Sequence, residues 1–152
     1  MIINVTDRIK KEEIAKEILS DLPEWFGVEE YTKEYIENSV NMPFFACLHE
    51  GKEVGFLSLK ETSDSTIEIY CMGILKKCQN LGYGRSLINE ALNYARYNRY
   101  KLIQVKTVEQ GRYEEYDKTN LFYQKMGFLK LEVFKNLWDE WNPCQVLVKV
   151  VE

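Results

Sequence analysis

The chain has 152 residues, of which 45% are hydrophobic and 29% are charged, and its formal net charge is -4. This length is that of one ordinary domain, so we expect residues 1–152 to form a single domain around one core. A mildly acidic composition gives no general attraction to nucleic acid or to a membrane surface, and neither is expected as a partner. No apolar run approaches the roughly 20 residues that cross a bilayer, and no signal-peptide pattern opens the chain, so a cytoplasmic location is expected.

The first 40 residues predict a short apolar stretch followed by two helices. In residues 14–22 the apolar side chains recur at helical spacing, with Asp7 or Thr6 as the N-cap and Pro23 as the stop. A weaker helix is expected over residues 32–40.

The rest of the chain alternates strands and helices. The expected strands are residues 44–48, 54–59, 66–75, 101–108, 128–134 and 145–151, and the expected helices are residues 84–96 and 118–126. The turn at residues 49–52 contains a glycine and is typical of an antiparallel hairpin. Gly73, inside an apolar strand, indicates a bulge or a close approach of the backbone. This order of elements predicts a layered α/β (or α+β) domain in which helices cover a mixed sheet.

The four cysteines are scattered along the chain and form no Cys-x-x-Cys pair, which predicts reduced thiols and no metal site. They are Cys47, Cys71, Cys78 and Cys144. The sole histidine, His49, is expected in a hairpin far along the chain from Cys71. A cysteine–histidine enzyme is therefore disfavoured, and Cys71 is expected to be a small core residue.

The most informative segment lies where a predicted strand leads into a predicted helix. Its sequence is Gln79-Asn80-Leu81-Gly82-Tyr83-Gly84. Two glycines at this point allow backbone N–H groups and the positive end of the helix to converge on a phosphate group. The segment is not a dinucleotide fingerprint, because Leu81 and Arg85 break the G-x-G-x-x-G spacing, and it is not a P-loop.

Two segments together resemble the GNAT superfamily of acetyl-CoA-dependent N-acetyltransferases. Residues 72–74 leading into residues 79–85 look like the acetyl-CoA motif of that family, and residues 120–128 look like its later Asn and Tyr-x-x-x-Gly-Phe signature. The resemblance covers essentially the whole chain. It implies the GNAT-type acyl-CoA N-acyltransferase fold, with about seven mostly antiparallel strands in a mixed sheet and about four helices. The chain departs from the family at Asn80 and Leu81, where Gly or a basic residue is frequent.

The resemblance implies acetyl-CoA as the acetyl donor and no metal. The strand end would pair with the pantetheine arm, the loop and helix start would hold the pyrophosphate, and two later residues would approach the pantetheine and the sulfur. In that order these residues are Met72, Gly73 and Ile74; Gln79, Asn80, Leu81, Gly82, Tyr83, Gly84, Arg85 and Ser86; and Asn120 and Tyr123.

The implied reaction is a direct attack by an amine, which needs a base because an ammonium group with a pKa near ~10.4 is not nucleophilic. Glu68 is the leading candidate, because it is a lone carboxylate in an apolar strand, and Glu109 is its rival. The structural alternative for Glu68 is a solvent-facing strand position. A backbone N–H near Ile74 would stabilise the oxyanion. Tyr123 suits protonation of the departing thiolate, and its alternative is a packing tyrosine.

The acceptor is expected to be a primary amine of a small molecule or a peptide. Acidic residues that could attract a cationic amine are Glu109, Glu114, Glu115, Asp117, Asp139 and Glu140; an ordinary solvated acidic surface is the alternative. Two other classes stay open: a catalytically silent GNAT-like module that binds acetyl-CoA, and an interaction protein that shares only the fold. The sequence also leaves open whether the chain forms a homodimer.

Overall fold

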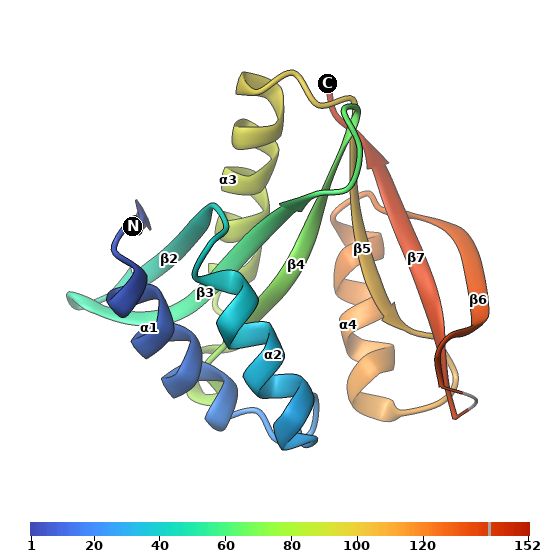
Figure 1. Ribbon diagram of the computed structural model, residues 1–152, viewed down its shortest axis with the longest axis horizontal. Coiled ribbons are helices and arrows are strands. Elements are labelled where there is room, and N and C mark those ends of the chain that lie inside the picture. Colours follow the sequence, from blue (N-terminus) through green and yellow to red (C-terminus); the bar gives the residue numbers. More distant parts are fainter. Residues whose placement is uncertain (140) are drawn as a thin grey trace. The chain divides into compact units, whose positions relative to one another are not determined.

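The computed structural model describes residues 1–139 and 141–152 (Figure 1). Its elements are β1 (Ile2–Asn4), α1 (Arg8–Ser20), α2 (Glu29–Ser39), β2 (Phe44–His49), β3 (Lys52–Glu61), β4 (Thr66–Ile74), the short 3₁₀ helix η1 (Lys76–Cys78), α3 (Tyr83–Tyr97), β5 (Leu102–Val108), α4 (Glu114–Lys125), β6 (Leu129–Asp139) and β7 (Asn142–Val150). The predicted order of strands and helices is confirmed. No helix among these described residues is both long enough and apolar enough to span a membrane.

The seven strands form a mixed sheet in the order β1-β2-β3-β4-β5-β7-β6. The pairs β1–β2, β2–β3, β5–β7 and β6–β7 are antiparallel. A mixed sheet of seven strands with four α-helices confirms the predicted fold class.

The chain divides into two compact units. The first unit is Met1–Lys60 with Ile69–Tyr94, and the second unit is Glu61–Glu68 with Ala95–Glu152. The first unit therefore holds β1, β2, β3 except its last residue, most of β4, helices α1 and α2, and most of α3. The second unit holds the beginning of β4 together with β5, β6, β7 and α4.

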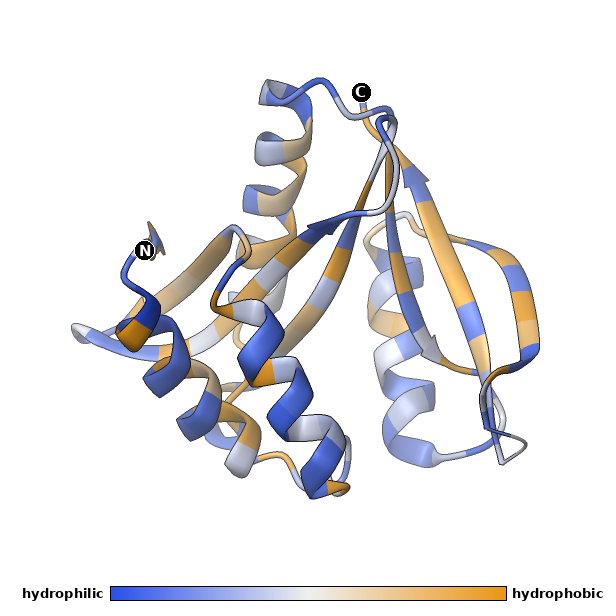
Figure 2. Ribbon diagram, in the orientation of Figure 1, coloured by the Kyte–Doolittle hydropathy of each residue, from blue (hydrophilic) through white to orange (hydrophobic). Residues whose placement is uncertain are grey.

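Helices cover both faces of the strands in the first unit. Ser58 lies on the same face of the hairpin as its cross-strand partner Phe44, and its hydroxyl is 2.9 Å from the hydroxyl of Ser39 in α2. Phe45, which alternation places on the opposite face, has its ring 6.0 Å from that of Tyr94 in α3. Figure 1 shows α1 and α2 together in front of β2 to β4, and Figure 2 shows the hydrophilic residues along their outer surfaces.

Helix α1 begins as predicted, because the Asp7 carboxylate accepts a hydrogen bond from the Ile9 amide at 3.4 Å. Its apolar residues from Ile14 to Leu19 are buried, and they meet β4 at Gly73, where an added Cβ would lie 3.0 Å from Ile18 and 3.1 Å from Leu22, which follows the helix. This close approach of backbone to helix is what a glycine inside the strand predicted.

The hairpin between β2 and β3 also forms as predicted. Its two central residues, Glu50 and Gly51, have φ angles of 50° and 79°, and His49 pairs with Lys52. Two successive positive φ angles are typical of a type I′ turn, whose twist matches that of the flanking strands.

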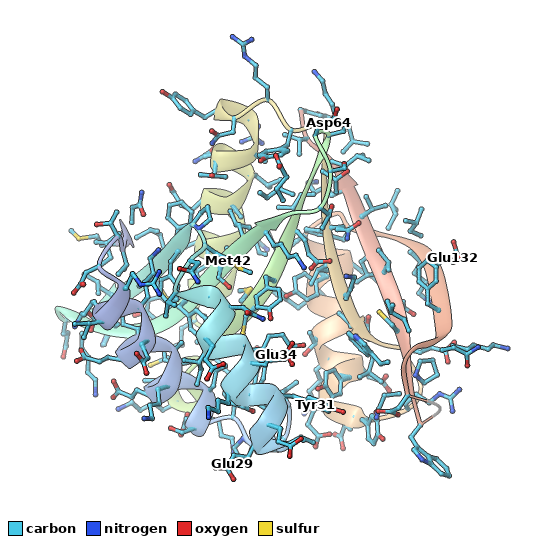
Figure 3. All side chains as sticks on the ribbon, in the orientation of Figure 1. Glu29, Tyr31, Glu34, Met42, Asp64 and Glu132 are labelled. Atoms are coloured by element: carbon cyan, nitrogen blue, oxygen red, sulfur yellow. The ribbon has the colours of Figure 1, made fainter. Side chains whose placement is uncertain are left out.

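Two helices begin about one turn earlier than predicted. Helix α2 begins at Glu29 and α4 at Glu114, and both carry acidic residues in the first turn. Negative charge is favourable at the positive end of a helix, but it leaves no apolar periodicity for the sequence pattern to detect. Figure 3 shows Glu29 and Tyr31 at the exposed beginning of α2. The acidic residues Glu114, Glu115 and Asp117, which precede the predicted helix 118–126, therefore belong to α4 itself.

Strand β6 is longer than predicted and lies at the outer end of the sheet order. Its apolar residues are largely exposed, for example Leu129 at 69% and Leu131 at 60%. Charged residues alternate with them, including Lys130 and Glu132, the latter labelled in Figure 3. Interleaved charge at an outer strand disfavours indiscriminate pairing with other chains.

Candidate functional site

The segment Gln79 to Gly84 leads from η1 into the first turn of α3, as predicted. The Gln79 side chain folds back on the end of β4, because its Nε2 donates a hydrogen bond to the Ile74 carbonyl at 3.1 Å. Asn80 and Gly82 have positive φ angles of 63° and 94°. A Cβ added at Gly82 would meet no atom within 4 Å. The backbone at Gly82 is therefore exposed, and no other group packs against the position of its missing side chain.

Helix α3 starts at this open backbone. The Gly82 carbonyl accepts hydrogen bonds from the amide and the hydroxyl of Ser86, both at 3.1 Å. The first amide groups of a helix have no acceptor within the helix, and its positive end attracts anions. Arg85 and Ser86 are exposed beside these amides. The exposed glycine, the helix start and the adjacent Arg85 guanidinium together fit a pyrophosphate group.

The end of β4 leads into this loop, but Gly73 has a packing role. Met72 and Ile74 are partly exposed, whereas the α-carbon of Gly73 faces α1, where a side chain would collide with Ile18. The glycine thus allows α1 to pack closely on β4 in the core of the first unit. The predicted pairing of residues 72–74 with a pantetheine arm stays a prediction.

In the second unit, Glu68 is buried, with 4% of its surface exposed. Its Oε1 accepts a hydrogen bond from Gln104 Nε2 at 2.8 Å and lies 3.2 Å from Lys106 Nζ. Gln104 and Lys106 are two residues apart in β5 and therefore share one face of that strand. The solvent-facing alternative for Glu68 is wrong. A buried carboxylate held by an ammonium and an amide is fixed in position, with its charge balanced.

The rival carboxylate, Glu109, has a different environment. Its Oε1 accepts from Nε and Nη2 of Arg112, at 3.3 and 3.2 Å, and its side chain is 32% exposed. Solvent screens an exposed ion pair, so Arg112 holds the Glu109 carboxylate less firmly than Gln104 and Lys106 hold that of buried Glu68.

Asn120 is fully buried and its amide is completely used by the protein. Its Oδ1 accepts from Thr107 and from Gln145, both at 2.8 Å, and its Nδ2 donates to the carbonyls of Val108 and Tyr116 at 3.1 and 2.9 Å. An amide offers two acceptor and two donor positions, and all four are occupied. Asn120 therefore fastens α4 to β5 and β7, and its side chain has no position left for pantetheine.

Tyr123 lies on the next turn of α4 and is buried, with 5% exposed. Its ring lies edge-on to those of Phe122 and Phe128, with centroids 5.3 and 5.5 Å away. The ring thus packs in the core of the second unit. Packing of the ring and proton donation by the hydroxyl are compatible, so the catalytic role stays a prediction.

The acidic residues expected beside an acceptor have local structural partners. Glu114 pairs with Lys118 at 3.7 Å, and Asp117 accepts from the Gly111 amide at 2.7 Å. Asp139 accepts from two backbone amides of the β6–β7 turn, each at 2.9 Å. Glu140 lies outside the described residues. These contacts fit the alternative of an ordinary acidic surface better than a dedicated amine pocket.

All four cysteines are free and buried. Burial raises the pKa of the Cys71 thiol, which fits a core residue and not a nucleophile. Among residues 1–139 and 141–152, no cluster of three or more histidine, cysteine or acidic side chains could hold a metal ion.

One contact at the loop has no signal in the sequence. The hydroxyl of Tyr83 lies 2.6 Å from Nδ1 of His49, although the two residues are 34 positions apart. The hairpin between β2 and β3 thus touches the start of α3.

Comparison with known proteins identifies the family. Residues 41–130 match the family model described as the acetyltransferase (GNAT) domain. Because the match spans more than half of the chain, the chain belongs to the GNAT acetyltransferase family, and the resemblance found in its sequence is confirmed. No curated protein sequence matches the chain.

Solved structures share the fold at low sequence identity. A protein assigned to the GNAT family from Desulfovibrio desulfuricans is 15% identical with a TM-score of 0.84, and 100% of this chain and 99% of that chain are covered. An aminoglycoside 6'-N-acetyltransferase complexed with coenzyme A is 16% identical with a TM-score of 0.77, covering 100% and 97%. A GNAT family acetyltransferase from Elizabethkingia anophelis with acetyl-CoA bound is 20% identical with a TM-score of 0.68, covering 85% and 87%.

Proposed function

We propose that this chain is an N-acetyltransferase that uses acetyl-CoA to acetylate a primary amine. The observation that carries the proposal is the start of α3, where Gly82 at a φ of 94° leaves the backbone open. An exposed helix start of this kind suits a pyrophosphate. Coenzyme A and acetyl-CoA in two of the solved structures with this fold support the same ligand.

Each part of the cofactor has proposed partners in the chain. The backbone from Gln79 to Ser86 binds the pyrophosphate, with Arg85 as an additional cation. The end of β4 at Met72 and Ile74 pairs with the pantetheine arm. Asn120 contributes by fixing α4, and thereby the position of Tyr123, because its own amide is already occupied.

Acetyl-CoA supplies the acetyl group as an activated thioester. Glu68 accepts the proton of the acceptor ammonium, directly or through a water molecule, and the freed nitrogen lone pair forms the new bond to the acetyl carbonyl carbon. A backbone N–H near Ile74 stabilises the oxyanion. The carbon–sulfur bond then breaks and its electron pair leaves on sulfur, to which the Tyr123 hydroxyl donates a proton. The new amide nitrogen gives up its remaining extra proton, through water, to the Tyr123 oxygen, which restores the hydroxyl.

The proposed acceptor is a primary amine of a small molecule or a peptide. The aminoglycoside acetyltransferase with the same fold supports a small-molecule amine, and its low identity carries no closer assignment. The local pairing of Asp117 and Asp139 argues against a pocket built on the acidic residues that the sequence pointed to.

Calorimetry with acetyl-CoA followed by an amine library tests the proposal. Turnover is read as release of the CoA thiol, and Glu68→Gln serves as the matched control protein. We expect binding of acetyl-CoA and thiol release that depends on the amine. Binding of acetyl-CoA without turnover of any amine would make the chain a catalytically silent acetyl-CoA-binding module. Absence of acetyl-CoA binding at millimolar concentration would mean that the chain is an interaction protein that shares only the fold.

A further inference from the structure

The only histidine in the sequence is hydrogen-bonded to the loop at the start of α3. Its Nδ1 lies 2.6 Å from the Tyr83 hydroxyl, and the two rings meet edge to face with centroids 6.1 Å apart. Partial burial, followed by the Cys78 and Cys47 thiols and the Glu50 carboxylate, raises the pKa of the Tyr83 phenol. The phenol therefore keeps its proton and remains a hydrogen-bonding partner.

Tyr83 stands at the junction between the glycine-containing loop and helix α3. It is the first residue of α3 and lies between two glycines, and Leu81 before them is 66% exposed. The Gln79 side chain anchors the start of the loop to β4. The Tyr83 side chain anchors its end to the β2–β3 hairpin, so the loop is held at both ends.

The hairpin offers a firm support for this contact. His49 is paired with Lys52 across a two-residue turn, and the ammonium of Lys52 lies 3.1 Å from a Glu17 carboxylate oxygen in α1. The other ring nitrogen of His49 lies 3.8 Å from the Glu50 carboxylate. His49 also ends β2, whose residues Phe44 to Cys47 are buried, so the histidine stands on an element packed in the core of the first unit.

We propose that His49 is a positioning residue for the phosphate loop, which holds Tyr83 and so orients the first amide groups of α3 toward the pyrophosphate of CoA. This inference rests on the proposed function. A loop that is already ordered loses less conformational freedom when a ligand binds, so the contact increases affinity without touching the ligand.

The test is a double-mutant cycle with CoA affinity measured by calorimetry. A neutral hydrogen bond contributes about 0.5–1.5 kcal/mol, so His49→Ala and Tyr83→Phe should each raise the dissociation constant roughly 2- to 12-fold. The double variant should show no larger loss than either single variant, because both remove the same contact. His49→Asn should restore most of the affinity, since its side-chain oxygen can reach the place of Nδ1.

Matched controls separate this role from general loss of structure. Tyr97→Phe makes the same chemical change on the same helix at a residue that is 87% exposed, and it should leave CoA affinity unchanged. In turnover assays His49→Ala should raise KM for acetyl-CoA more than it changes kcat.

Three results would overturn the inference. Wild-type CoA affinity in His49→Ala and Tyr83→Phe would show that the contact does not matter, and additive losses in the double variant would show that the two residues act separately. Failure of His49→Asn to recover affinity would assign the loss to packing. If the unaltered protein does not bind CoA at all, the proposed function itself fails, which the same calorimetry distinguishes.

Discussion

Lys106 and Glu68 form an ion pair between two strands of the second unit, with Nζ 3.2 Å from Oε1 and the Glu68 side chain 5% exposed. Gln104 donates to the same carboxylate oxygen. The pair gives the proposed base a fixed position and a neighbouring positive charge, and both properties can be tested through the pH dependence of the reaction.

We expect Glu68→Gln to lower the rate near pH 7 by roughly 10²- to 10⁴-fold, the usual contribution of a general base. Part of the rate should return at alkaline pH, where more of the acceptor is already the free amine. Lys106→Met should also lower the rate at every pH, because the Glu68 carboxylate loses the ammonium that fixes its position. The pH–rate profile of kcat/KM for the amine measures both effects.

Lys101→Met removes an exposed lysine next to the same strand and should keep the wild-type profile. If Glu68→Gln follows the wild type at every pH, Glu68 is a structural carboxylate. Glu109→Gln is then the variant to examine in the same assay.

Tyr123→Phe should lower kcat more than it raises KM for acetyl-CoA, because only a hydroxyl used when the thiolate leaves is removed. The ring contacts with Phe122 and Phe128 remain in this variant. Steady-state kinetics measure kcat and KM for the two proteins, under conditions in which the chemical step is shown to be rate-limiting. A wild-type kcat would reduce Tyr123 to a packing residue.

Gly82→Ala should weaken CoA binding about ten-fold or more. A positive φ angle costs an alanine roughly 1–2 kcal/mol, so the backbone of the loop should shift away from the conformation that binds the pyrophosphate. Gly111→Ala is the matched control, since Gly111 has a φ of 96° and equally open surroundings. Both variants should lose similar stability in thermal unfolding. Only Gly82→Ala should lose affinity in calorimetry, and equal affinities in the two variants would contradict the phosphate-loop assignment.

Asn120→Ala should destabilise the fold by roughly 2–4 kcal/mol, because it leaves buried hydrogen-bonding groups of Thr107 and Gln145 without their partner. Urea unfolding measures the loss. Asn89→Ala, at an exposed position of α3, should stay within about 0.5 kcal/mol of the wild type. A small effect of Asn120→Ala would mean that α4 is held mainly by its apolar contacts.

The native protein should react slowly with a thiol reagent at pH 8, whereas all four cysteines should react in denaturant. Burial raises the pKa of Cys47 and of Cys144 to about 11, so only about one thiol in a thousand is ionised at that pH. Because the thiolate is the reactive form, labelling should accelerate as the pH rises toward 11. Rapid labelling of the native protein at pH 8 would contradict the burial of these side chains.

Local patterns account for what could be predicted about the fold. The order of elements, the hairpin turn and the glycine loop at the start of α3 each depend on residues close together in the chain. The starts of α2 and α4 were missed because Glu29 and Glu114 favour a helix through charge, which has no apolar period. Gly73 was correctly singled out, but its neighbour proved to be α1.

The sequence by itself determined the family, the strand and helix order and the candidate residues, because periodicity and short motifs are properties of contiguous residues. Only the tertiary structure decided that Glu68 is buried beside Lys106, that the Asn120 amide is fully occupied, and that His49 meets Tyr83. Each of these contacts joins side chains from separate elements. Their pairing depends on strand register and helix packing, which no single stretch of sequence specifies.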